Sequence, residues 1–145
     1  MIDGSNTGWA AVEAEHAFAK ALRARRRASL AHRFLRRCIE CARLAVVDAA
    51  GTRPDGSALG MRDIPLDLIV GSLEPHRAEQ FDSEFRPSAP TRRRWTSVWL
   101  AEERGTVLPP ISVAPIGGAY AIRDGHHRVS VARARGALSI TARVA

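Results

Sequence analysis

The chain has 145 residues, of which 46% are hydrophobic, and its 22 lysines and arginines outnumber its 15 aspartates and glutamates. This composition excludes disordered, collagenous and membrane-spanning proteins, because no run approaches the roughly 18 apolar residues that a membrane span needs. The first residues lack the basic-then-apolar layout of a secretion signal, so we expect a cytoplasmic protein whose two cysteines are reduced thiols.

A long helix is predicted at the start of the chain. Residues 9–48 contain no proline or glycine and are rich in Ala, Arg, Leu and Glu, which favour helix. Arginines crowd most of its surface, and the formal net charge of the chain is +7. That surface is either a solvated face or an arm that lies along nucleic acid or an acidic membrane. Apolar residues at three- and four-residue steps predict one buried stripe, formed by Phe18, Leu22, Leu30, Phe34, Cys38, Cys41 and Ala45.

A turn-rich linker follows at residues 51–60, which hold three glycines and a proline. It divides the chain into an N-terminal Arg-rich helical segment with its linker, residues 1–62, and a domain at residues 63–145. The domain is predicted to open with a strand at 64–70 and a loop at 71–90.

A second helix is predicted at residues 91–104, with Thr91 as its cap and Gly105 as its stop. Trp95, Val98 and Trp99 fall on its inner face. Three consecutive arginines, residues 92–94, stand where they oppose the helix dipole, which indicates an anion nearby.

The last third predicts strands at 111–114 and 119–123 around a Gly117-Gly118 turn, then a helix at 126–135 and a strand at 140–144. The junction of the second strand and the helix reads Asp124-Gly125-His126-His127-Arg128. Backbone N–H groups and the positive end of a helix dipole suit an anion at such a junction. Gly125 permits close approach to the backbone, and Arg128 can donate hydrogen bonds to two phosphate oxygens. Both imidazoles can donate hydrogen bonds or move protons. Alternatively, His126 and Arg128 only cap the helix and pair with Asp124.

From about Ile64 to Val144 the sequence resembles the ParB/sulfiredoxin-like domain, and in particular the small bacterial ParB-like nuclease-domain proteins. The resemblance rests on residues 99–105, 108–113 and 119–125, and above all on the block at 124–128. It implies an α+β fold, a small mixed domain preceded here by a long basic helix. It also implies that the helix opened by the block holds the phosphates of a nucleoside triphosphate, CTP or ATP, with or without Mg²⁺.

Members of this superfamily differ in activity. ParB proteins bind and slowly hydrolyse CTP as DNA clamps, sulfiredoxins use ATP on an oxidised cysteine, and a free serine kinase phosphorylates an amino acid. ParB proteins have Gly-Glu-Arg-Arg at the block, so Gly125 and Arg128 match while the histidines do not. Sulfiredoxins place their reactive cysteine where this chain has His126. The spacing of the first ParB box adds Arg77 as a second phosphate contact.

The leading hypothesis is therefore a domain that binds nucleotide phosphates through Gly125, His126, His127, Arg128 and Arg77. It would associate with DNA through its basic surface, as a partitioning or regulatory protein. The rival is an enzyme of phosphoryl transfer or phosphodiester hydrolysis, in which His127 is the general acid or base and His126 and Asp124 complete the catalytic group. Asp124 would orient an imidazole or hold Mg²⁺. A third possibility is a non-catalytic module in which the Arg-rich helix binds a partner.

Cys38 and Cys41 have the spacing of a metal-binding pair, with His32 as a possible third ligand. They lie deep in a helical pattern, however, where two small apolar residues are ordinary. No metal site is predicted.

Overall fold

The computed structural model describes residues 4–35, 42–48 and 60–145. Three helices of more than one turn and one short helix are found in these ranges: α1 (Gly4–Phe34), α2 (Pro75–Ala78), α3 (Arg92–Glu103) and α4 (His126–Ala134). The strands of the described residues are β1 (Ala45–Val46), β2 (Gly60–Pro65), β3 (Ile69–Ser72), β4 (Ile111–Ile116), β5 (Ala119–Asp124) and β6 (Ser139–Val144).

The six strands form one mixed sheet in the order β1-β3-β5-β4-β6-β2. β3 is parallel to both of its neighbours, β1 and β5, and β4 is parallel to β6. The β4–β5 hairpin and the β2–β6 pair are antiparallel. The expected α+β fold with a leading helix is confirmed by this arrangement.

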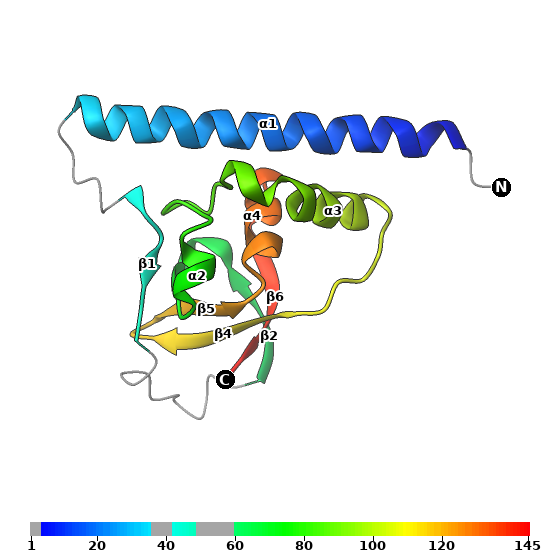
Figure 1. Cartoon of the computed structure of the whole chain (residues 1–145). Coiled ribbons are helices and arrows are strands. Elements are labelled where there is room, and N and C mark those ends of the chain that lie inside the picture. Colours follow the sequence, from blue (N-terminus) through cyan, green and yellow to red (C-terminus); the bar gives the residue numbers. More distant parts are fainter. Residues whose placement is uncertain (1–3, 36–41, 49–59) are drawn as a thin grey trace.

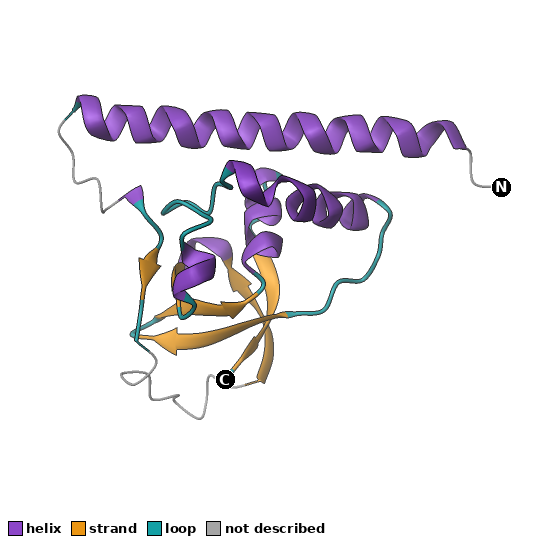
Figure 2. Cartoon of the chain, in the orientation of Figure 1, coloured by secondary structure: helices purple, strands orange, loops and turns teal. Residues whose placement is uncertain are grey.

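Helices gather on one side of the sheet. Figures 1 and 2 show α2, α3 and α4 between the sheet and α1, which lies across the top of the molecule. The main core lies against the sheet and includes Ile69, Phe81, Ile122 and Val129, all 2% exposed or less. Burying such side chains is worth roughly 1.5–3 kcal/mol each, so this core fixes the strands and α4 relative to each other.

A second cluster joins α1 to the rest of the protein. Phe18 of α1 packs on Trp95 of α3 with ring centroids 5.6 Å apart, and Val131 of α4 completes the contact. The indole N–H of Trp95 donates a hydrogen bond to the Ser130 hydroxyl at 2.8 Å, so α3 is also tied to α4. α1 thus packs on α3 and α4.

Three predicted elements are wrong in extent. The long helix ends at Phe34, and residues 45–46 form β1 instead of continuing it. The strand predicted at 64–70 is two strands, β2 and β3, separated by a 3-10 turn η4 (Leu66–Leu68). The predicted loop at 71–90 contains α2, whose first residue is Pro75, a favourable place for proline because no intrahelical N–H is needed there.

The predicted apolar stripe of α1 is also wrong beyond Leu22. Leu30 and Phe34 are exposed, at 57% and 86%. Smaller and polar side chains, among them Arg25, Ala28 and His32, face the rest of the protein at that end of the helix. Cys38 and Cys41, and residues 51–59 of the predicted linker, lie outside the described residues. No helix in the described part of the chain is long and apolar enough to cross a membrane.

Candidate functional site

The turn between β5 and α4 places the predicted block at the start of a helix. β5 ends at Asp124, Gly125 has φ +112°, and α4 begins at His126. A Cβ at position 125 would lie 2.4 Å from Cγ2 of Ile111, so only glycine lets the turn pack against β4 in this conformation. The first helical hydrogen bond runs from the Val129 N–H to the Gly125 carbonyl at 3.0 Å. The amides of residues 126–128 therefore stand at the positive end of the helix.

His126 is buried and joins α4 to β3. It is 0% exposed, and its Nε2 lies 2.6 Å from the Ser72 hydroxyl. That hydroxyl also accepts a hydrogen bond from the Glu74 N–H at 2.9 Å, and the His126 ring stacks on Phe81. Nδ1 of His126 has no hydrogen-bond partner among the described residues. With no exposed surface, His126 is placed to hold the turn and not to touch a ligand, which differs from the predicted contact.

His127 lies closer to the surface, against the edge of the same phenylalanine. Its ring centroid is 5.2 Å from that of Phe81, and the residue is 7% exposed. Burial, followed by the charges of Arg94 and Arg77, lowers the pKa of His127 to about 4. Burial, followed by Arg77 and His127 and opposed by Asp124, lowers the pKa of His126 to about 4. Both imidazoles are therefore neutral at pH 7.

Arg128 is engaged by groups of its own chain. Its guanidinium donates hydrogen bonds to the backbone carbonyls of Pro109 and Pro110, the latter at 3.1 Å, and to the Asp124 carboxylate at 3.2 Å. The side chain is 15% exposed. Arg128 thus fixes the 109–110 segment against the turn, and a guanidinium with several charge-assisted partners has few donors left. Its fork to phosphate oxygens stays a prediction.

Arg77 of α2 lies at the turn, as the sequence analysis places it. Its guanidinium is 3.9 Å from the Asp124 carboxylate, and both side chains are largely exposed. Asp124 is thus shared between Arg77 and Arg128. An exposed pair of this kind contributes little to stability, so Arg77 is free to exchange its partner for another anion.

Arg94 is the residue that the predicted site lacks. It lies in the first turn of α3, is exposed, and is near enough to His127 for its charge to lower the pKa of that imidazole. The only sequence signal for it is the run of three arginines at a helix start, where they oppose the dipole. The charges of Arg77 from α2 and Arg94 from α3 therefore both act on His127, in the first turn of α4.

Comparison with known proteins gives few matches. No family model matches the chain, and no curated protein matches it. The structure is similar to the crystal structure of sulfiredoxin from Arabidopsis thaliana, with a TM-score of 0.43 and 19% sequence identity over 59% of this chain and 83% of that one.

Proposed function

We propose that this protein binds the phosphate groups of a nucleoside triphosphate at the start of α4. The observation that carries the proposal is the pair of exposed arginines, Arg77 and Arg94, whose charges both reach His127 at the positive end of this helix. Guanidinium groups match phosphate geometry, and a helix N-terminus adds fixed partial positive charge. Arg77, Arg94 and the amides of residues 126–128 bind in this proposal, while Gly125, His126 and Arg128 shape the turn.

Mg²⁺ would arrive with the nucleotide. The carboxylate of Asp124 already faces Arg77 and Arg128, so it is a poor candidate for a dedicated metal ligand. Magnesium in nucleotide sites is held largely by phosphate oxygens and water, which requires no protein cage. We therefore expect Mg²⁺ to change affinity through the charge of the nucleotide.

The basic face of α1 supports the second half of the proposal, association with DNA in a partitioning or regulatory role. Lys20, Arg23 and Arg27 follow one another at three- and four-residue steps and are all exposed. None of the three forms an ion pair with another described residue. Such a row can contact successive phosphates of a nucleic acid backbone without reading its sequence.

Catalysis of phosphoryl transfer or phosphodiester hydrolysis is the second candidate. Its support is the neutral state of His127, which can accept a proton. A pKa of about 4 makes that imidazole a weak base at pH 7, however, and His126 has no exposed surface. Binding without turnover therefore fits this geometry better.

The test is a titration with fluorescent CTP and ATP analogues, with and without Mg²⁺. We expect Arg77→Ala and Arg94→Ala each to weaken binding about tenfold or more, because a charge-assisted hydrogen bond is worth about 1.5–3 kcal/mol. Arg104→Ala, at the far end of α3, is the matched control and should bind like the wild type. Wild-type affinity in both site variants would contradict the proposal.

The same samples separate binding from catalysis. Incubating the wild type with ATP, CTP and a DNA duplex, and measuring released phosphate and cut DNA, should give no turnover above the buffer rate. Turnover that is lost in His127→Gln would instead favour the enzymatic candidate.

A further inference from the structure

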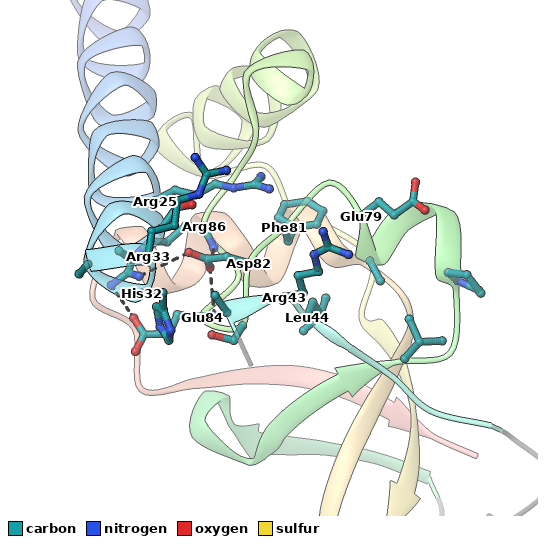
Figure 3. Close-up of a pocket in the computed structure, with 18 residues that line it drawn as sticks. Arg25, His32, Arg33, Arg43, Leu44, Glu79, Phe81, Asp82, Glu84 and Arg86 are labelled. Carbon is teal, nitrogen blue, oxygen red and sulfur yellow. Dashed lines mark hydrogen bonds and ion pairs between the residues drawn. The ribbon is translucent and has the colours of Figure 1, made fainter. Parts of the chain in front are cut away.

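A cavity lies between the C-terminal half of α1 and the segment 81–86, on the other side of Phe81 from the α4 turn. Its volume is about 890 Å³, in the range of small-molecule sites. Residues 42–46 and α2 complete its walls. Figure 3 shows that its side chains come from four separate segments, with arginines from α1 and from residues 42–46 around the same space.

The acidic side chains of segment 81–86 are already engaged. Oδ1 of Asp82 accepts hydrogen bonds from the Glu84 and Arg86 N–H groups at 3.0 and 2.8 Å. Oδ2 of Asp82 pairs with the Arg86 guanidinium at 3.4 Å, and Glu84 pairs with the same guanidinium at 2.5 Å. Arg86 and these two carboxylates therefore form a closed group, which leaves little negative charge for other cations.

Three further arginines line the cavity with donors to spare. Arg25 uses one nitrogen to donate to the Gln80 carbonyl at 3.1 Å, and burial lowers its pKa while Asp82 raises it. Arg33 and Arg43 form no ion pair within the described ranges. Nδ1 of His32, which also lines the cavity, is buried and has no hydrogen-bond partner among the described residues. Arg33 and Arg43 are thus the cationic donors of this cavity that have no ion-pair partner among the described residues, whereas Arg25 already lies in the field of Asp82.

The Glu79 carboxylate and the Ser29 and Ser83 hydroxyls also line the cavity, and the rest of the wall is apolar. Leu44, Ala78 and Phe81 are each 4% exposed or less and line the cavity, together with Ala28 of α1. An inorganic anion would leave this surface against water, whereas a molecule with an apolar body would cover it. The arginine donors and the apolar wall together fit a ligand that has both an anionic group and an apolar body.

We propose that this cavity binds a small organic anion that has an apolar body, with its carboxylate, sulfonate or phosphate group held by Arg33 and Arg43 and the body on Leu44 and Phe81. The site is separate from the α4 turn and does not depend on the proposed nucleotide binding. Two guanidinium groups bind planar or tetrahedral oxyanions well, so the anionic group of the ligand is expected to be a carboxylate, sulfonate or phosphate.

The probe for the test is 1-anilinonaphthalene-8-sulfonate, an apolar aromatic anion whose fluorescence rises when it leaves water. We expect saturable binding to the folded wild type with one molecule per chain. Arg33→Met/Arg43→Met should weaken it tenfold or more, because methionine keeps the apolar stem and removes the charge. Ala28→Trp should also weaken it, because the indole occupies part of the cavity while every charge remains. Arg104→Met, outside the cavity, is the matched control.

Circular dichroism and thermal unfolding of each variant distinguish lost binding from lost folding, since the dye also binds loosened cores. The two cavity variants should bind fluorescent nucleotide like the wild type, which separates this site from the α4 turn. Absence of saturable dye binding to the wild type would overturn the proposal. So would dye affinity that is unchanged in both folded cavity variants.

Discussion

Gly125 is the residue on which the β5–α4 turn depends. It has φ +112°, and an added Cβ would meet Ile111 Cγ2 at 2.4 Å. We expect Gly125→Ala to lower the free energy of unfolding by at least about 2 kcal/mol, from backbone strain and the clash together. Urea unfolding followed by circular dichroism measures this. Gly118→Ala is the control: position 118 has φ +77° with nothing within 4 Å, so only the strain, about 1 kcal/mol, is expected.

His126 and His127 make stability depend on pH. Their pKa values are lowered from 6.5 to about 4 in the folded protein, so the unfolded chain binds more protons between these limits. The free energy of unfolding should therefore fall as the pH drops from about 6.5 towards 4, and be unaffected by these groups above 7. We expect a loss of roughly 1–2 kcal/mol per histidine between pH 7 and pH 5.

Urea unfolding at pH 7, 6 and 5 tests the sign and the size. His127→Gln should show a shallower fall than the wild type, because one of the two groups is gone. An NMR titration gives a direct check, in which the imidazole signals of both residues stay constant from pH 7.5 to 5.5. Stability that rises as the pH falls through this window would show that the histidines are not buried neutral.

At the residue scale, the sequence predicts where a residue lies better than it predicts which groups that residue contacts. Gly125 lies where the block places it, because a turn glycine obeys local rules. Arg77, which only the resemblance brings to the block, lies in α2 with its guanidinium 3.9 Å from the Asp124 carboxylate. Arg128 pairs with Asp124, as the alternative for the block predicts, but its other partners are backbone carbonyls 18 and 19 residues earlier, and a carbonyl carries no sequence signal. The burial of His126 likewise depends on Ser72 and Phe81, which only the folded chain brings to it.

Elements with strong local signals are predicted closely. The β4–β5 hairpin, α3 and α4 agree with expectation within a few residues, because Gly117-Gly118, Gly125 and Gly136 mark the boundaries. The end of α1 is not predicted, since residues 35–48 keep helix-favouring composition while residues 45–46 pair with β3. Tertiary pairing overrides local propensity there, as it does where η4 divides the predicted strand.

The packing of α1 on α3 is the contact that an element-scale prediction can test. Phe18 is 4% exposed against Trp95, whereas Leu30, which the predicted stripe also includes, is 57% exposed. We expect Phe18→Ala to lower the free energy of unfolding by about 3 kcal/mol and Leu30→Ala by less than about 0.5 kcal/mol. Chemical denaturation of both variants measures the difference. Equal losses would mean that Leu30 is packed as the sequence pattern predicts.

Charge at the scale of the whole molecule is unevenly placed. Several acidic groups are paired within the fold, for example Glu102 and Glu103 with Arg135 and Asp82 with Arg86. The exposed cations of α1 have no such pairs among the described residues. The excess of seven positive charges is therefore presented in part as a row on one long helix, which is the geometry for a linear polyanion.

Salt dependence of DNA binding tests this row. Each neutralised phosphate contributes about −0.9 to the slope of log K against log salt concentration. We expect the triple variant Lys20→Ala/Arg23→Ala/Arg27→Ala to make that slope shallower by about 2–3 and to weaken binding of any duplex sequence. Fluorescence anisotropy with a labelled duplex at a series of salt concentrations measures both quantities.

The control removes three other exposed charges, in Arg62→Ala/Arg104→Ala/Arg143→Ala, and so changes the net charge by the same amount. Arg62 and Arg143 lie on β2 and β6, which Figure 1 places at the opposite end of the molecule from α1. If the α1 row holds the duplex, the control variant keeps nearly the full slope, because none of its three charges belongs to that row. Equal slopes in the two variants would assign the binding to net charge alone and remove α1 as the interface.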